Sequence, residues 1–178
     1  MGQFLDQIVM ASKRGRGFSE KVLVGIRPEQ FARKPRFETV GGPRVVDCNH
    51  PCFVFGHLSL YPSRIAMFLN VDAAGLDAPT GFEALFKAGV DCQDDVEGKI
   101  YPAMETVTRA FFQSYDRLYE RMARVDDAVL LREVPEERYR QFFPTVGAAA
   151  GFMLTSHIMM HMGQVSTWRR CFGLPSAM

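Results

Sequence analysis

Hydrophobic positions near the N-terminus recur at alternating spacings of four and three residues. Apolar or small residues occupy six such positions: Phe4, Ile8, Ala11, Gly15, Phe18 and Val22. This period is typical of the buried stripe of a helix. Gly15 falls on the stripe, where a missing side chain allows another helix to approach closely. The pattern predicts a helix over residues 3–24, followed by an irregular connection from Arg27 to Pro43 that contains three prolines.

A second helix is expected to begin at His50-Pro51. Proline suits the first position of a helix and pushes the residue before it out of the helical region, so His50 is predicted to be the N-cap. From Cys52 to Leu69 nearly every position is apolar, as in a central helix of a bundle. Pro62 lies inside this segment and removes one backbone hydrogen bond, which predicts a kink there.

About thirty residues rich in glycine separate this helix from the next strong one. Thr80 to Glu83 has the form of a capping box ahead of Leu85 and Phe86, which predicts one short helix within the link. A link of this length can run the ~30 Å of a 20-residue helix, so it allows the two flanking helices to be parallel.

The third helix is expected to open at Pro102. Its buried face is predicted to consist of Met104, Val107, Phe111, Leu118, Met122 and Val125.

The fourth helix is predicted to run from Thr145 to Phe172. Its stop signals agree with one another, since Arg169 and Arg170 lie in the last turn, Gly173 just past the end and Pro175 beyond it. Strand signals are weak throughout the chain. The sequence therefore predicts an all-α four-helix bundle that forms a single domain over residues 1–178.

Composition narrows the class of protein. The chain has 178 residues, 47% of them hydrophobic, which excludes a disordered chain. A formal net charge of +1 removes the electrostatic argument for a nucleic-acid binder. Asp6 and Gln7 interrupt the N-terminal apolar stretch, so it is not a signal peptide, and no run approaches the roughly 20 apolar residues that span a bilayer. Four cysteines are too few for a disulfide scaffold, and we expect a cytoplasmic protein with reduced thiols.

Four histidines are present: His50, His57, His157 and His161. His157 and His161 are four residues apart on the predicted fourth helix, about 5–6 Å from each other, so both imidazoles can reach one cation. His57 is the candidate third ligand, because a buried imidazole in an apolar helix needs a partner. Three protein ligands would leave one coordination position open, as in reactive zinc sites. The alternative is a set of core histidines satisfied by hydrogen bonds.

Other metal motifs are absent or weaker. Ile158 stands where a metalloprotease motif has glutamate, and no Glu-x-x-His occurs for a di-iron carboxylate bundle. The pair Cys48 and Cys52, which brackets His50, lacks a second ligand pair and is better interpreted as a capped helix start. The methionines of the fourth helix have helical spacing, which favours core packing over binding of a soft metal.

Several short motifs stand in the predicted helices. Asn49-His50-Pro51 and Gly56-His57-Leu58 lie in and just before the second helix. The fourth helix carries His157-Ile-Met-Met-His161-Met-Gly-Gln164, followed by Trp168-Arg-Arg and Gly173-Leu-Pro175, and Tyr101-Pro102 stands at the start of the third. With these motifs the chain resembles the DinB/YfiT-like superfamily over essentially its whole length.

The resemblance implies a four-helix bundle with up-down-down-up topology, often homodimeric. It implies a divalent metal, usually nickel or zinc, held by three histidines that map onto His57, His157 and His161. Members of the superfamily with assigned activities are mostly transferases or isomerases that use low-molecular-weight thiols. Others are described as metal-dependent hydrolases.

The residues help to choose between these chemistries. A hydrolase needs a general base beside the metal-bound water, and no Asp or Glu lies within one turn of the three histidines, although folding could bring Asp47 or Glu105 to the site. A thiol needs no separate base, because coordination to a divalent metal deprotonates it. The leading hypothesis is a metal-dependent transferase that joins a small thiol to a small-molecule substrate. The alternatives are a metal-dependent hydrolase and a non-enzymatic metal-binding dimer.

Arg64 is the candidate for binding a substrate anion. It lies two turns after His57 on the same helix face, where its guanidinium could hold a carboxylate. The alternative role for Arg64 is a surface ion pair.

Overall fold

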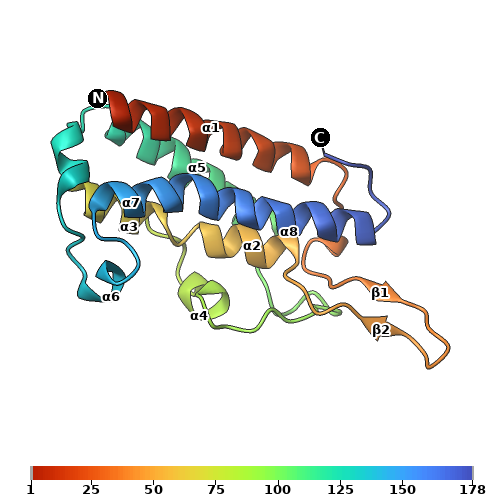
Figure 1. Cartoon of the computed structure of the whole chain (residues 1–178). Helices are drawn as coiled ribbons and strands as arrows, with labels where there is room; N and C mark the ends of the chain where they lie inside the picture. Colours follow the sequence, from red (N-terminus) through yellow and green to blue (C-terminus); the bar gives the residue numbers. More distant parts are fainter. Residues whose placement is uncertain (1, 178) are drawn as a thin grey trace.

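The computed structural model describes residues 2–177 and is mostly helical, which confirms the all-α class (Figure 1). The elements in chain order are α1 (Gln3–Leu23), β1 (Arg36–Phe37), β2 (Arg44–Val45), α2 (Pro51–Leu58), α3 (Pro62–Leu69), α4 (Phe82–Phe86), α5 (Met104–Met122), α6 (Glu137–Arg140), α7 (Val146–Gly151) and α8 (His157–Cys171). Short 3-10 turns lie at Pro28–Gln30 and Asp127–Leu131, and a π-helical turn, Phe152–Ser156, joins α7 to α8.

The first helix has the predicted extent but buries a different face. Its buried residues are Leu5, Val9, Ser12, Gly15, Ser19 and Val22. Phe4, on the predicted stripe, is 75% exposed instead. The buried face carries small side chains at its centre, and a Cβ added at Gly15 would touch the Met159 sulfur at 3.4 Å. Close packing against α8 therefore decides which face is buried, and the predicted stripe was wrong by one residue over most of its length.

Pro62 does more than kink the second helix. The segment is divided into α2 and α3, which are separated by Ser59–Tyr61. Pro62 becomes the first residue of α3, where its missing N–H costs no hydrogen bond. The predicted N-cap is confirmed, since the His50 Nδ1 accepts a hydrogen bond from the Phe53 backbone N–H at 3.1 Å.

The fourth helix has its predicted ends, apart from a turn of different geometry inside it. Thr145 caps α7 by accepting a hydrogen bond from the Ala148 N–H at 3.2 Å, and Gly173 ends α8 with a positive φ of 70°. The π-helical turn just before His157 was not predicted. Such turns insert one extra residue into a helix and shift the side chains that follow, frequently at functional sites.

The link between α3 and α5 contains the predicted short helix, α4. Gly81, with a positive φ of 90°, stands at its N-cap and no side chain caps it, so the capping box expected from Thr80 is not formed. Most of the predicted face of α5 is buried, and so are Ser114, Tyr115 and Tyr119. The helix begins at Met104, two residues after Pro102. The irregular connection after α1 holds the two-stranded antiparallel hairpin β1–β2, which extends away from the helices in Figure 1.

The long helices pack side by side around one core. α1 packs on α8, α2 packs on α4, α5 and α8, and α3 packs on α5 and α7. α2 is buried on every face. By length and composition alone the segment Pro51–Leu69 is long and apolar enough to cross a membrane, but 78% of its 18-residue apolar window is buried inside the protein. Burial of this extent is typical of a helix in the core of a protein.

Candidate metal centre

Three histidines from two segments meet at one point between α2 and α8. The Nε2 of His157 lies 3.3 Å from the Nε2 of His57 and 3.1 Å from the Nε2 of His161. All three side chains are buried, and their ligand atoms lie within 4.8 Å of one another. No other group of histidine, cysteine and carboxylate side chains in residues 2–177 converges in this way. The structure thus brings together the three predicted ligands.

The hydrogen-bond partners fix which nitrogen of each ring is free. The Nδ1 of His57 donates to the Phe86 carbonyl at 2.8 Å, and the Nδ1 of His161 donates to the Gln164 side-chain oxygen at 2.9 Å. Each of these rings, when neutral, has one proton, so its Nε2 carries a lone pair. The Nδ1 of His157 is buried and has no hydrogen-bond partner within the described part of the chain.

These lone pairs make the centre electron-rich. His157, when neutral, has one proton and two neighbouring nitrogens, so it can donate to at most one of them. At least one of the Nε2 atoms of His57 and His161 therefore receives no proton from His157. In a tetrahedral zinc site with N–Zn bonds of ~2.0–2.1 Å, neighbouring nitrogens are about 3.3–3.4 Å apart, close to the two spacings seen here. A cation at the centre would be bound by one nitrogen of each ring.

Burial keeps the three rings neutral, as metal ligands must be. It lowers the pKa of His157 to about 3, with a further contribution from the two neighbouring imidazoles. It also lowers the pKa of His161 to about 4, although the hydrogen bond to Gln164 acts in the opposite direction. The pKa of His57 is lowered too, again chiefly by burial. Protons therefore do not compete for these nitrogens near neutral pH.

Close packing of α4 on α2 supplies the partner of His57. A Cβ at Gly56 would lie 2.6 Å from the Phe86 ring carbons, a distance that real Cβ atoms do not show. Glycine at this position lets α4 come near enough for the Phe86 carbonyl to accept the His57 proton. Gly56 belongs to the sequence motif that resembles the DinB/YfiT-like superfamily, and this contact gives it a physical role.

A second set of contacts surrounds His161. The Gln164 oxygen that accepts the His161 proton also accepts a hydrogen bond from the Asn49 side chain at 3.4 Å. Outer partners of this kind orient a ligand ring and raise its basicity. Asn49 comes from the segment before α2 and Gln164 from α8, so this contact also connects the two segments that provide the ligands.

Tyr61 and Arg64 lie on the other side of His57. The Tyr61 hydroxyl is 3.3 Å from the His57 Nε2, and burial raises the pKa of this phenol. The Arg64 guanidinium lies 5.3 Å from the centre of the Tyr61 ring and donates to both Glu83 carboxylate oxygens, at 2.9 and 3.0 Å. This ion pair is the second of the two roles considered for Arg64. Binding of a substrate anion by Arg64 stays a prediction.

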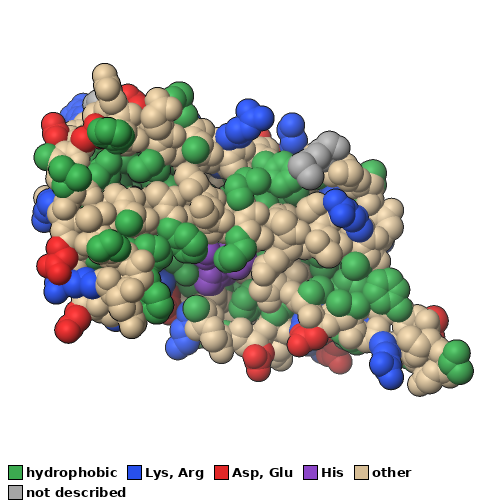
Figure 2. Space-filling view, viewed as in Figure 1, with side chains coloured by type: hydrophobic (Ala, Val, Ile, Leu, Met, Phe, Trp, Pro, Cys, Tyr) green, Lys and Arg blue, Asp and Glu red, His purple; other side chains and the backbone are tan. Residues whose placement is uncertain are grey.

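A cavity of about 410 Å³ opens onto the three histidines. Its lining residues are Asn49, Phe53, His57, Tyr61, Lys87, Ala88, Gly89, Val90, Phe152, His157, Met160 and His161. In Figure 2 histidine atoms are visible in a hollow bordered by hydrophobic side chains. No carboxylate is among these lining residues.

The two carboxylates considered as bases lie elsewhere. The Glu105 side chain is 84% exposed and pairs with Arg109 on α5. The Asp47 side chain is 96% exposed and pairs with Lys34. Asp47 lines a larger neighbouring cavity of about 1010 Å³, which shares Asn49, Val90 and Met160 with the first.

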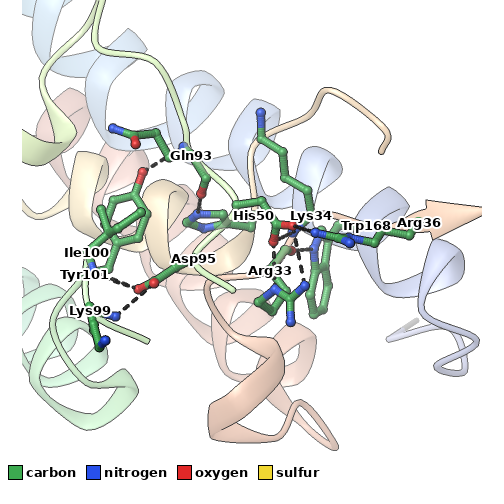
Figure 3. A network of polar contacts seen from close by, with 11 residues as sticks. Arg33, Lys34, Arg36, His50, Gln93, Asp95, Lys99, Ile100, Tyr101 and Trp168 are labelled. Atoms are coloured by element: carbon green, nitrogen blue, oxygen red, sulfur yellow. Dashed lines mark hydrogen bonds and ion pairs between the residues drawn. The ribbon is translucent and has the colours of Figure 1, made fainter. Parts of the chain in front are cut away.

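A polar network fixes the start of α2 (Figure 3). The His50 Nε2 donates to the Gln93 carbonyl at 2.9 Å, and the Gln93 N–H donates to the Tyr101 hydroxyl at 2.9 Å. Asp95 accepts three backbone N–H groups, those of Lys99, Ile100 and Tyr101. The link before α5 is thereby tied to the N-terminus of α2.

The same network reaches α8. Burial alone would raise the pKa of Asp94, but hydrogen bonds from Arg33 and Arg36 outweigh it and hold that pKa well below its usual range. The Trp168 ring N–H on α8 donates to the Arg33 carbonyl at 2.7 Å. Cys48 and Cys52, close to His50, are free thiols outside the histidine cluster, as the capped-helix interpretation expects.

Sequence reasoning missed the partners of the ligands. Tyr61 is four residues after His57 and Gln164 three residues after His161, which are the spacings of neighbours on one helix face. These spacings could have identified Tyr61 and Gln164 as neighbours of the two histidines. No sequence signal pointed to the Phe86 carbonyl, because backbone groups carry no residue identity.

Comparison of the chain with protein-family models, with curated proteins and with solved structures finds no match.

Proposed function

We propose that this protein binds one divalent metal ion, zinc or nickel, through His57, His157 and His161 and uses it to activate a small thiol for transfer to an electrophilic small molecule. The observation that carries the proposal is the meeting of the three Nε2 atoms in a cavity whose lining includes no carboxylate. Three protein ligands leave room for an exogenous ligand at the cation.

The absence of a carboxylate from the lining favours a thiol over water as the nucleophile. Water activation benefits from a general base as well as from the metal. A thiol that coordinates a divalent cation loses its proton outright, so the cavity needs no base of its own. Arg64 is our candidate for holding a substrate carboxylate, which would replace Glu83 as its partner.

A cavity of about 410 Å³ favours an enzyme over a protein that merely holds a metal. Its volume lies within the ~300–1,000 Å³ of small-molecule sites, and apolar side chains such as Phe53, Phe152 and Met160 share its lining with the histidines. A non-enzymatic binder has no need of such a space beside its ion.

The deciding assay presents metal-loaded protein with electrophiles in the presence and absence of small thiols, alongside ester and amide substrates. We expect turnover that needs the thiol and is lost in His161→Ala. The matched control is His50→Asn, which changes a histidine outside the centre and keeps a capping side chain. Hydrolysis of esters or amides without thiol, lost in His161→Ala, would replace the transferase by the hydrolase. Stoichiometric metal without any turnover would favour the metal-binding dimer.

We also propose that the chain has the up-down-down-up arrangement of a four-helix DinB-like bundle. Three contacts support it. Asp127, just after α5, accepts N–H groups from the first turn of α1, so these helices run in opposite directions. Arg169 at the end of α8 donates to the carbonyl of Val24 beyond the end of α1, so these two are parallel. The His50 and Tyr101 rings, 4.9 Å apart, bring the starts of α2 and α5 together.

The last part of the proposal is a cytoplasmic homodimer without nucleic-acid or membrane partners. Exposed apolar side chains support an association surface, because Met67 on α3 and Met159 and Met160 on α8 are each about half exposed. Light scattering at micromolar concentration is expected to give twice the chain mass. A mass of 20.1 kDa would contradict the dimer.

A further inference from the structure

The Tyr61 hydroxyl touches the same nitrogen that would ligate the metal. It lies 3.3 Å from the His57 Nε2, and its ring stands edge-on to the rings of His157 and His57, with centroids 4.5 and 5.1 Å away. Tyr61 lies in the break between α2 and α3 that Pro62 creates. The break therefore positions a hydroxyl group at the edge of the cluster, on the cavity side.

The position of the His57 proton determines the direction of the hydrogen bond between Tyr61 and His57. The His57 Nδ1 proton is used on the Phe86 carbonyl, so the His57 Nε2 offers only a lone pair. In the contact between Tyr61 and His57 the phenol O–H must therefore donate. A cation bound at that Nε2 takes the lone pair, and the Tyr61 O–H then has to find a new acceptor.

We infer that Tyr61 is the hydrogen-bond donor to the exogenous ligand of the metal, and so a catalytic residue of the site. This inference rests on the proposed metal-dependent function. Nitrogens bound to one tetrahedral cation lie about 3.3–3.4 Å from one another, so the hydroxyl, at 3.3 Å from the ligating nitrogen, lies close to the position that an exogenous ligand would take. An atom of the exogenous ligand is thus an acceptor that the phenol can reach with a small movement.

The side chains around Tyr61 hold the phenol in place for this role. The Arg64 guanidinium lies over the ring, and Glu83 on α4 holds Arg64 through both carboxylate oxygens. The substitution Tyr61→Phe keeps the ring and its contacts and removes only the hydroxyl. The hydroxyl can therefore be tested without disturbing the packing.

The test uses the full chain loaded with Co²⁺, with 2-mercaptoethanol as the thiol probe. Two quantities are measured for wild type and Tyr61→Phe: the affinity for Co²⁺ in competition with a chelator, and the dissociation constant of the thiol from the sulfur-to-cobalt absorption band. Tyr119→Phe is the matched control, because it removes a hydroxyl that bonds Ser12 at 2.7 Å, away from the cavity.

We expect Tyr61→Phe to bind one Co²⁺ per chain at least as tightly as wild type, since the competing hydrogen bond to His57 is gone. We expect it to bind the thiol roughly tenfold more weakly, as the loss of one hydrogen bond to a charged acceptor predicts. Tyr119→Phe should match wild type in both measurements.

Other outcomes would overturn the inference. Equal thiol affinity in wild type and Tyr61→Phe, both with full Co²⁺, would overturn the role of Tyr61 and leave the proposed function standing. A loss of Co²⁺ affinity of a hundredfold or more in Tyr61→Phe would make the phenol oxygen a metal ligand rather than a donor. Failure of the wild-type chain to bind Co²⁺ at all would overturn the proposed function and the inference together.

Discussion

Two histidines seven residues apart, His50 and His57, are both buried around α2, yet their surroundings differ. His50 has both ring nitrogens paired, with Nδ1 accepting from the Phe53 N–H and Nε2 donating to the Gln93 carbonyl. The Nδ1 of His57 donates to the Phe86 carbonyl, whereas its Nε2 faces two other imidazoles and the Tyr61 hydroxyl. The first histidine caps a helix, whereas the second forms part of an electron-rich centre.

The comparison shows that burial and a lowered pKa do not by themselves identify a metal site. Burial lowers the pKa of His50 to about 4, the same value as for His161. What separates the two sites is hydrogen bonding. Both ring nitrogens of His50 have a partner, whereas in the cluster the buried Nδ1 of His157 has none within the described residues.

The largest expected effect is the loss of metal binding when a proposed ligand is removed. His57→Ala, His157→Ala and His161→Ala should each abolish stoichiometric zinc or nickel, because two imidazoles hold a cation far more weakly than three. Elemental analysis of protein purified without an affinity tag measures this. His50→Asn should keep full metal content, and so should Cys48→Ala. Full metal content in His57→Ala would remove the proposed difference between the two histidines.

The next effect is stabilisation by the metal. A metal ion at 100 times its dissociation constant should raise the free energy of unfolding by about 2.7 kcal/mol. A chelator should lower the melting temperature and leave the helical circular dichroism at 25 °C unchanged, because the core is large enough to fold without the ion. Loss of helicity on chelation would instead indicate a structural metal site.

A smaller effect is expected from an outer partner. Gln164→Ala removes the acceptor of the His161 proton and should weaken metal binding by about 10- to 100-fold. Calorimetric titration with zinc measures the change. The control is His50→Asn, which alters a hydrogen-bonded histidine that has no contact with the cluster. Unchanged affinity in Gln164→Ala would show that the hydrogen bond to the Gln164 side chain does not support the ligation by His161.

The last expected effect is a dependence of stability on pH that both regions share. His50, His157 and His161 have folded-state pKa values of about 3 to 4, below the ~6.5 of an unfolded chain. Between these values only the unfolded chain takes up the protons. Their contribution to stability is therefore complete above pH 6.5 and is lost as the pH falls towards 4 and 3.

Urea unfolding of metal-free protein at several pH values between 7 and 5 measures this dependence. Each such proton contributes at most about 1.4 kcal/mol per pH unit. His157→Gln should flatten the curve by removing one titrating group. A free energy of unfolding that does not change over this range would mean that the rings are more accessible to protons than their burial implies.

Local patterns along the chain were sufficient for most of the helices. Apolar periodicity predicted the extent of α1 and most of the buried face of α5, and proline and glycine predicted the start of α2 and the end of α8. These features depend on residues within a few positions of one another, which is why they can be inferred without knowing the fold. The pair His157 and His161 is of this kind, since one helical turn separates them.

Packing decided what local patterns could not. The buried face of α1 is set by how closely Gly15 and its small neighbours approach α8, not by where its largest side chains lie. Pro62 separates α2 from α3 completely, and a π-helical turn interrupts the fourth helix just before His157. Each of these features depends on contacts between residues that are far apart in the chain. Such contacts cannot be inferred from the local sequence pattern.

By itself the sequence determined an all-α chain and named the three histidines that meet. Only the tertiary structure decided how they are used. It paired His57 with the Phe86 carbonyl and left the His57 Nε2 facing the cluster and the Tyr61 hydroxyl. It also left the cavity lining without a carboxylate. The physical reason is that the sequence specifies which groups can carry a proton or a lone pair, whereas only their positions in space determine which of those groups remain unpaired.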